Sequence, residues 1–171
     1  KSGDAGIFDV EPGIVMEEML EKSPGSHEVS AEMVMQNGRP VLAIVSDTLS
    51  IGSKGDYPGG SMTFPSQQSE SVQQDFIDVA VAFLTALGFR NGNVRVDMIR
   101  TPNGARAIEA NLRMGGASIW KCVEILTGVN LVRQGFRALL GLRVDPGRKS
   151  TQTLVYSFIA ARYSGEIADI Q

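Results

Sequence analysis

Polar side chains alternate with apolar ones along two segments near the middle of the chain. The first segment carries Arg95 and Asp97, and the second carries Glu109, Asn111 and Arg113. Residues two apart on a β-strand point to the same face, so pairing of the two segments would bring carboxylate, amide and guanidinium groups together. Oxygen ligands of this kind suit Mg²⁺ bound with a nucleotide's phosphates. Arginines beside them suit an anionic intermediate.

A simpler interpretation is that alternating charge only marks a solvent-facing strand. That accounts for Arg95 and Asp97 taken alone, and an ion pair between these two is a further alternative. It accounts poorly for residues 109–113, because this run leads into Gly115-Gly116 and then an apolar segment containing Trp120. A strand between apolar partners should not carry polar side chains on one face without partners for them. We therefore favour a functional site at these positions.

The composition is that of an ordinary globular chain of one or two domains, with 171 residues, 43% hydrophobic and 20% charged. A formal net charge of −3 gives no sign of a nucleic-acid partner. Apolar runs are too short to span a membrane. A single cysteine, Cys122, excludes an internal disulfide and fits a cytoplasmic protein. Because His27 is the only histidine, we expect electrostatics and a metal ion, rather than histidine acid–base chemistry, to dominate the mechanism.

Hydrophobic periodicity predicts an α+β chain with a largely antiparallel sheet. Residues 13–20 are expected to form a buried strand, and residues 28–35 and 40–45 a hairpin around Asn37-Gly38. The Gly-, Ser- and Pro-rich residues 46–66 are expected to form a long loop. A second hairpin is expected to join the segment with Arg95 and Asp97 to the segment that begins at Glu109.

Helical periodicity follows a capping-box pattern at Ser71-Val72-Gln73-Gln74, and Gly88 is expected to end that helix. Further helices are predicted over 119–126 and 131–140, the second with Asn130 as its cap. Residues 154–161 and 166–170 are predicted strands. The chain contains no glycine-rich phosphate-binding loop of the Walker or dinucleotide type.

The run Asp97…Glu109-x-Asn111-x-Arg113-x-Gly-Gly resembles the C-terminal portion of the ATP-grasp domain of carboxylate–amine ligases. The resemblance covers about residues 13–141. It implies an α+β ATP-grasp C-terminal subdomain, with helices flanking the sheet and a small C-terminal β extension over 142–171. Residues 1–12 would be the tail of a preceding lid region.

The same resemblance implies roles for individual residues. The metal ligands would be Asp97, Glu109 and Asn111, holding two Mg²⁺ ions, with Mn²⁺ as an alternative. The catalytic residues would be Arg95 and Arg113, which stabilise the acyl phosphate and the tetrahedral oxyanion. The ATP contacts would be Glu17, Glu18, Met19 and Leu20 at the adenine, Glu28 at the ribose and Lys54 at the triphosphate.

The activity implied is ATP-dependent formation of an amide or peptide bond through an acyl phosphate, with ADP and phosphate released. An amino acid or dipeptide ligase is the first expectation. Alternatives are a biotin-carboxylase-like or purine-pathway ATP-grasp enzyme, or a nucleotide-binding module without ligase activity. Expected partners are ATP, small carboxylate and amine substrates, a missing N-terminal part of the same protein, and a second copy in a homodimer. These 171 residues alone are expected to be catalytically incomplete.

Overall fold

The computed structural model describes residues 14, 16–51 and 57–158. Six strands form one sheet in the order β5-β4-β1-β2-β3-β6, and every neighbouring pair is antiparallel. The strands are β1 (Glu28–Gln36), β2 (Arg39–Ile51), β3 (Tyr57–Phe64), β4 (Gly92–Thr101), β5 (Gly104–Asn111) and β6 (Leu154–Ser157). The helices are α1 (Glu70–Ala86), α2 (Ile119–Thr127) and α3 (Leu131–Leu139). The predicted α+β class with an antiparallel sheet is confirmed.

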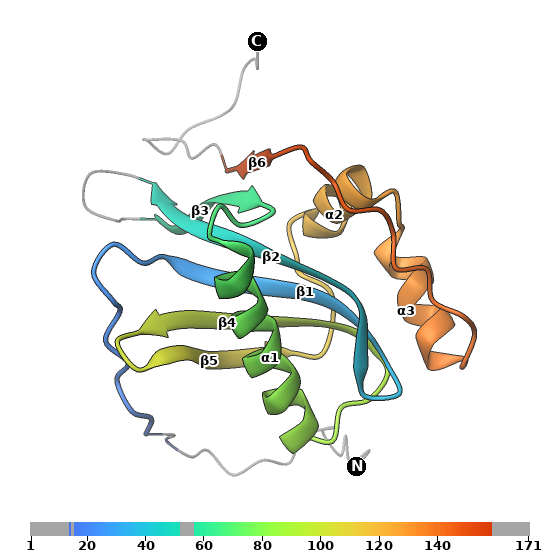
Figure 1. Cartoon of the computed structure of the whole chain (residues 1–171), viewed down its shortest axis with the longest axis horizontal. Coiled ribbons are helices and arrows are strands. Elements are labelled where there is room, and N and C mark those ends of the chain that lie inside the picture. The colour runs from blue at the N-terminus through green and yellow to red at the C-terminus, as the bar shows by residue number, and fades with distance from the viewer. Residues whose placement is uncertain (1–13, 15, 52–56, 159–171) are drawn as a thin grey trace, which may run out of the picture.

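Helices cover the two faces of the sheet, with α1 on one face and α2 and α3 on the other (Figure 1). Alternate residues of the central strands supply the apolar face toward α1, as the two-residue period of a strand requires. The core on the α1 side includes Val29, Ala31, Met33, Phe76, Ala80, Leu84, Val94, Val96 and Met98. The core on the other side includes Val34, Leu42, Ile44, Phe64, Val123, Leu126 and Leu131.

Both predicted hairpins are present. Asn37 and Gly38 join β1 to β2 with positive φ angles of 55° and 78°, as expected for an Asn-Gly turn. The second hairpin joins β4 to β5, with Thr101 paired to Gly104. The register of this hairpin shifts between Asp97 and Met98. The hairpin therefore places the two polar segments side by side.

The predicted start of α1 was wrong by two residues. The N-cap is Ser69, whose side chain accepts a hydrogen bond from the Val72 backbone N–H, and not Ser71. The preceding turn decides this, because Asp47 accepts hydrogen bonds from Ser66 and from the Gln67 backbone and so fixes where the chain enters the helix. The predicted C-terminal end of α1 is off by one residue, because the C-cap is Leu87, just before Gly88. The predicted N-cap of α3 at Asn130 is confirmed.

The long loop predicted over residues 46–66 was also wrong. Strand β2 continues to Ile51 and β3 occupies Tyr57–Phe64, so strands fill most of this region. Glycine, serine and proline disfavour strands, but cross-strand pairing and the burial of Phe64 outweigh that preference.

The buried strand predicted over residues 13–20 is a third error. Residues 16–20 are not a strand, and Met16 and Met19 are 91% and 92% exposed. A strand needs a hydrogen-bonded neighbour, and none of the strands in the described residues pairs with this segment.

The C-terminal prediction is met only in part. Strand β6 is shorter than the predicted 154–161, and residues 159–161 and the predicted strand 166–170 lie outside the described residues. In the part of the chain that the structure describes, no helix combines the length and hydropathy needed to cross a membrane.

Candidate functional site

One face of the sheet carries a row of polar side chains that crosses four neighbouring strands. Glu109 on β5 lies opposite Asp97 on β4, Asp97 lies opposite Ser30 on β1, and Ser30 lies opposite Ser46 on β2. Directly opposed residues of an antiparallel pair share a face with their Cβ atoms roughly 5 Å apart. The structure therefore brings the two predicted carboxylates together.

A second row of side chains lies on the same face, two residues away from the first along each strand. Asn111 lies opposite Arg95, Arg95 lies opposite Glu32, and Glu32 lies opposite Ile44. Ile44 belongs to the apolar core under α2 and α3. Glu32 is thus the last polar residue of this row before the core begins.

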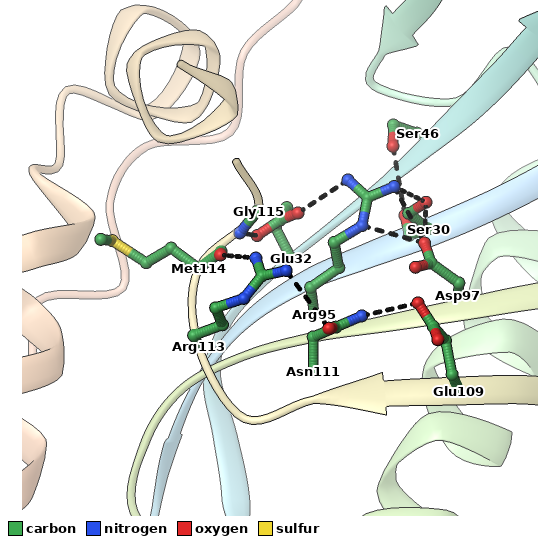
Figure 2. Close-up of polar contacts among 10 residues, drawn as sticks. All are labelled: Ser30, Glu32, Ser46, Arg95, Asp97, Glu109, Asn111, Arg113, Met114 and Gly115. Atoms are coloured by element: carbon green, nitrogen blue, oxygen red, sulfur yellow. Dashed lines mark hydrogen bonds and ion pairs between the residues drawn. The ribbon is translucent and has the colours of Figure 1, made fainter. Parts of the chain in front are cut away.

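Three acceptors hold the guanidinium of Arg95, one on β4 itself and two on the neighbouring strand β1 (Figure 2). Nε donates to Asp97 Oδ1 at 2.9 Å, Nη1 donates to Glu32 Oε1 at 3.1 Å and Nη2 donates to Ser30 Oγ at 2.6 Å. The Arg95 side chain is only 15% exposed. The ion pair with Asp97 that the sequence left open as an alternative is present.

Glu32 is almost completely buried, with 1% of its surface exposed. Its Oε2 accepts a hydrogen bond from the Gly115 backbone N–H at 3.0 Å, in addition to the bond from Arg95. Burial raises the pKa of this carboxyl, while the charge of Arg95 and the Gly115 N–H act in the opposite direction. Burial of the charged form is the larger effect.

Sequence reasoning did not single out Ser30 or Glu32 as site residues. A signal was present, because Glu28, Ser30 and Glu32 alternate with apolar residues along a predicted strand. The same two-residue period that drew attention to β4 and β5 would have placed these side chains on the polar face.

A second chain of contacts runs along the outer strand to Arg113. Asn111 Nδ2 donates to Glu109 Oε1 at 2.8 Å, and Arg113 Nη2 donates to Asn111 Oδ1 at 3.3 Å. Arg113 Nη1 also donates to the Met114 carbonyl at 2.8 Å. Arg113 lies just after β5 and is exposed. Unlike Arg95, it has no carboxylate partner among the described residues.

The oxygen atoms of the two rows fit a hard divalent cation. Asp97 uses Oδ1 for Ser30 and Arg95, and Glu109 uses Oε1 for Asn111, which leaves one oxygen of each carboxylate without a hydrogen bond among the described residues. No group of three or more His, Cys, Asp and Glu residues able to hold a metal occurs in the described ranges. Mg²⁺ in nucleotide sites commonly takes one or two carboxylates and completes its shell with phosphates and water. Asp97 and Glu109 match that donor set with their free oxygens, and the third oxygen donor is the amide oxygen of Asn111, which here accepts a hydrogen bond from Arg113 Nη2.

The predicted nucleotide contacts are less well placed. Glu17, Glu18 and Met19 are exposed and Leu20 is half-buried, in a segment without strand pairing among the described residues. Lys54 lies outside the described residues.

Glu28 begins β1 on the same face as Ser30 and Glu32, and its carboxylate accepts a hydrogen bond from Lys22 Nζ at 2.8 Å. Of the predicted ATP contacts that the structure describes, Glu28 is the one on the polar face.

The site is open on the side of Arg113. A cavity of about 290 Å³ is lined by Arg113 and its neighbours Leu112 and Met114, together with Val132 and Phe136 of α3. Arg113 therefore lies between this groove and the polar rows, within reach of a small molecule.

Comparison with known proteins places the fold. No family model matches the chain, and no curated protein matches it in sequence. Solved structures do match. An L-amino acid ligase from Bacillus licheniformis aligns with a TM-score of 0.66 at 17% identity, over 82% of this chain and 37% of that chain. Phosphoribosylglycinamide synthetase from Anaerococcus prevotii aligns with a TM-score of 0.66 at 18% identity, over 81% and 35%. Biotin carboxylase from Campylobacter jejuni aligns with a TM-score of 0.62 at 15% identity, over 81% and 30%.

These structural neighbours are ATP-grasp ligases. The chain has part of the ATP-grasp fold. It spans between 30% and 37% of the length of the three neighbours. At 15–18% identity the similarity establishes the ATP-grasp architecture of the sheet and helices. Activity and substrate have to be argued from the polar rows themselves.

Proposed function

We propose that this chain is the metal- and phosphate-binding part of an ATP-dependent carboxylate–amine ligase. The observation that carries the proposal is the pair of opposed carboxylates, Asp97 and Glu109, linked through Asn111 to the exposed guanidinium of Arg113. Phosphoryl transfer depends on positioning and on neutralising phosphate charge more than on proton shuttling. The site contains the groups for this and has no histidine.

Asp97, Glu109 and Asn111 are the residues that would hold Mg²⁺, as two ions, or Mn²⁺ in its place. A bound divalent cation neutralises the phosphate charge of ATP and aligns the γ-phosphate for transfer. The chain's own contribution is to keep the oxygen donors in place. Ser30 and Arg95 do this for Asp97 by hydrogen bonds to Oδ1, and Asn111 does it for Glu109.

The two arginines are assigned different roles. Arg113 is exposed and bonds only to Asn111 Oδ1 and the Met114 carbonyl among the described residues. Its remaining N–H groups are free to bind the acyl phosphate and the tetrahedral oxyanion. Arg95 was expected to share this role, but its guanidinium already serves Asp97, Glu32 and Ser30. We therefore assign Arg95 to positioning Asp97.

ATP is held partly by residues outside the polar rows. We retain Glu28 as the ribose contact, Lys54 as a triphosphate contact and the segment Glu17, Glu18, Met19 and Leu20 as the adenine contact. The exposed state of that segment is compatible with this role only if ATP or another part of the protein covers it, because apolar side chains such as Met16 and Met19 gain from burial.

The amide-forming activity is proposed for amino acid or dipeptide substrates, in line with the L-amino acid ligase among the structural neighbours. The second candidate is a biotin-carboxylase-like or purine-pathway reaction, which the matches to biotin carboxylase and phosphoribosylglycinamide synthetase favour. A binding module without catalysis is the third. Such a module would not need Arg113, whose guanidinium is exposed beside the carboxylates. The remaining part of the ligase, and a second copy in a homodimer, are the proposed protein partners.

The test is amine-dependent ADP release by the complete protein, screened over pairs of amino acids. Glu109→Ala is expected to abolish it while the far-ultraviolet circular dichroism and the unfolding midpoint stay unchanged, because Glu109 is exposed. Glu70→Ala removes an exposed carboxylate from α1, on the opposite face of the sheet, and is the matched control. Full ADP release by the Glu109→Ala protein would refute the metal-site assignment.

A further inference from the structure

We propose that Glu32 is a positioning residue that fixes the turn after β5 and thereby the place of Arg113. This inference rests on the proposed function, because Arg113 is the group that would contact the reacting phosphate. The physical link is the hydrogen bond from the Gly115 N–H to Glu32 Oε2, at 3.0 Å. This bond ties the connection between β5 and α2 to the middle of the sheet (Figure 2).

The contact is close enough to restrict the residue at position 115. A Cβ atom added to Gly115 would lie 2.4 Å from Glu32 Oε1 and 3.0 Å from Ile119 Cδ1. The first distance is shorter than a real Cβ contact allows, and both neighbours are themselves buried. A side chain at 115 would therefore push the turn away from the sheet or displace the Glu32 carboxylate.

Arg113 lies two residues before Gly115 and is held by the same turn. Its Nη1 donates to the carbonyl of Met114, and its backbone N–H donates to the Asn111 carbonyl at 2.7 Å. Movement of the turn at Gly115 would carry the Met114 carbonyl with it. The guanidinium of Arg113 would then lose its fixed direction toward Asn111.

The choice of glutamate at position 32 needs an explanation other than stability. Its neighbours Val34 and Ile44 belong to the apolar core, where a hydrophobic residue of similar size is often at least as stabilising as a buried ion pair. A hydrophobic residue could not accept hydrogen bonds from both Arg95 and Gly115. The carboxylate of Glu32 offers one oxygen to the arginine on β4 and the other to the backbone of the turn.

A size-exchange experiment tests this link in the complete protein. Gly115→Ala adds a methyl group against the carboxylate, and Glu32→Asp withdraws the carboxylate by about 1.5 Å, one C–C bond length. Each variant alone is expected to lower kcat/KM for the carboxylate substrate by about tenfold or more, the range of couplings between contacting residues. The double variant is expected to be at least about tenfold more active than the product of the two single effects predicts. Purely multiplicative effects would overturn the inference.

The matched control is Gly116→Ala. It adds the same methyl group one residue further on, where no atom lies within 4 Å of the added Cβ. This variant is expected to keep kcat/KM within about twofold of the parent protein. A loss equal to that of Gly115→Ala would show that any alanine in the turn is harmful. That result would also overturn the inference. Gly115→Ala is expected to keep the affinity of the parent protein for Mg²⁺–ATP. Loss of that affinity would show instead that the site has unfolded.

A readout independent of activity separates this inference from the proposed function. The Gly115 amide should exchange its hydrogen slowly in the parent protein and at least about tenfold faster in Glu32→Leu, because the acceptor is removed. Loss of Gly115 amide protection in Glu32→Leu would support the link. If the parent protein at the same time shows no ligase activity, the proposed function is refuted while the link stands. Unchanged exchange in Glu32→Leu would refute the link even if the protein is an active ligase.

Discussion

At the scale of single residues, the two arginines of the site illustrate how burial decides a role. Arg95 lies in the middle of the sheet and contacts carboxylates on two strands, whereas Arg113 lies beyond the end of β5 and faces solvent. Loss of a buried partner leaves uncompensated charge, while loss of an exposed one does not. The two residues should therefore respond differently to the same substitution.

Arg113→Ala is expected to reduce turnover without destabilising the protein. Removing one donor to a developing oxyanion costs roughly a hundredfold to a thousandfold in kcat, while an exposed substitution changes the free energy of unfolding by about 0.5 kcal/mol or less. Steady-state kinetics and urea unfolding of the complete protein check both parts. A normal kcat in Arg113→Ala would remove this residue from the mechanism.

Arg95→Ala is expected to destabilise the protein by about 3–5 kcal/mol, because it leaves the buried carboxylate of Glu32 without its charged partner. Arg106→Ala is the matched control on the neighbouring strand. Arg106 is exposed, and among the described residues it donates only to the adjacent Ala105 carbonyl, so its loss should change the free energy of unfolding by less than about 0.5 kcal/mol. Equal unfolding midpoints for the two variants would contradict this view of Arg95.

The pKa of Glu32 predicts a particular pH dependence of stability. Burial raises this pKa above the ordinary value of 4.5, so the folded protein binds this proton more tightly than the unfolded chain. Its contribution to stability is then complete below pH 4.5 and is lost as pH rises through the folded pKa. Relative to Glu32→Gln, which cannot titrate, the parent protein should lose free energy of unfolding over that interval.

Glu70 supplies a control of opposite sign for the same titration. Its hydrogen bond and ion pair with Lys149 lower the pKa, so any contribution of Glu70 is present above its unfolded pKa and is lost as pH falls through the folded pKa. Urea unfolding should therefore give opposite trends for the two residues. The parent protein should lose free energy of unfolding relative to Glu32→Gln as pH rises above 4.5, and relative to Glu70→Gln as pH falls below 4.5. A difference between Glu32→Gln and the parent protein that stays constant above pH 4.5 would show that burial does not raise the pKa of Glu32.

At the scale of elements, the site depends on one hairpin packed beside one central strand. Strands β4 and β5 are adjacent in sequence, so their polar rows could be expected to coincide. Strand β1 inserts next to β4 through a pairing between residues more than 60 positions apart, such as Ser30 with Asp97. That long-range pairing adds Ser30 and Glu32 to the site and keeps Asp97 in place.

The start of α1 gives a test at this scale. Ser69→Ala is expected to cost about 1 kcal/mol of the free energy of unfolding, because it removes the acceptor for the Val72 N–H. Ser71→Ala should cost clearly less, since Ser71 lies inside the first turn and its side chain is hydrogen-bonded only to Ser69 among the described residues. Urea unfolding of both variants provides the comparison, and a larger loss for Ser71→Ala would restore the capping box predicted from sequence.

At the scale of the whole molecule, apolar side chains gather at the surface beside Arg113. Val132, Phe136 and Leu139 of α3 line the groove next to Arg113 together with Leu112, and all four are exposed by 38% or more. Exposed apolar patches of this kind commonly mark interaction surfaces.

Nucleotide binding should be visible as a stability change of the complete protein. ATP with Mg²⁺, at a concentration of about 100 times its dissociation constant, is expected to add roughly 2.7 kcal/mol to the free energy of unfolding. EDTA should abolish most of this gain, because the phosphates would then meet the carboxylates of Asp97 and Glu109 without a cation between them. An undiminished gain in EDTA would show that ATP binds without the proposed metal ligands.

The local pattern of the sequence was sufficient for the features that depend on neighbouring residues. The Asn37-Gly38 hairpin, the helices at α2 and α3 and the shared face of Asp97 and Glu109 follow from turn chemistry and strand or helix period, which act over a few residues. The polar run that ends in Gly115-Gly116 likewise indicated a site before any contact was known.

Only the tertiary structure decided the features that depend on distant partners. The composition of residues 46–66 predicted a loop, yet the pairing of β2 with β1 and β3 makes most of them strand. The apolar residues near Met16 predicted a buried strand, yet no strand in the described residues pairs with them. The pairing of β1 with β4 adds Glu32 to the site, where it accepts a hydrogen bond from Arg95. Burial and strand pairing are energies of contact between remote segments, and no local window of the sequence contains them.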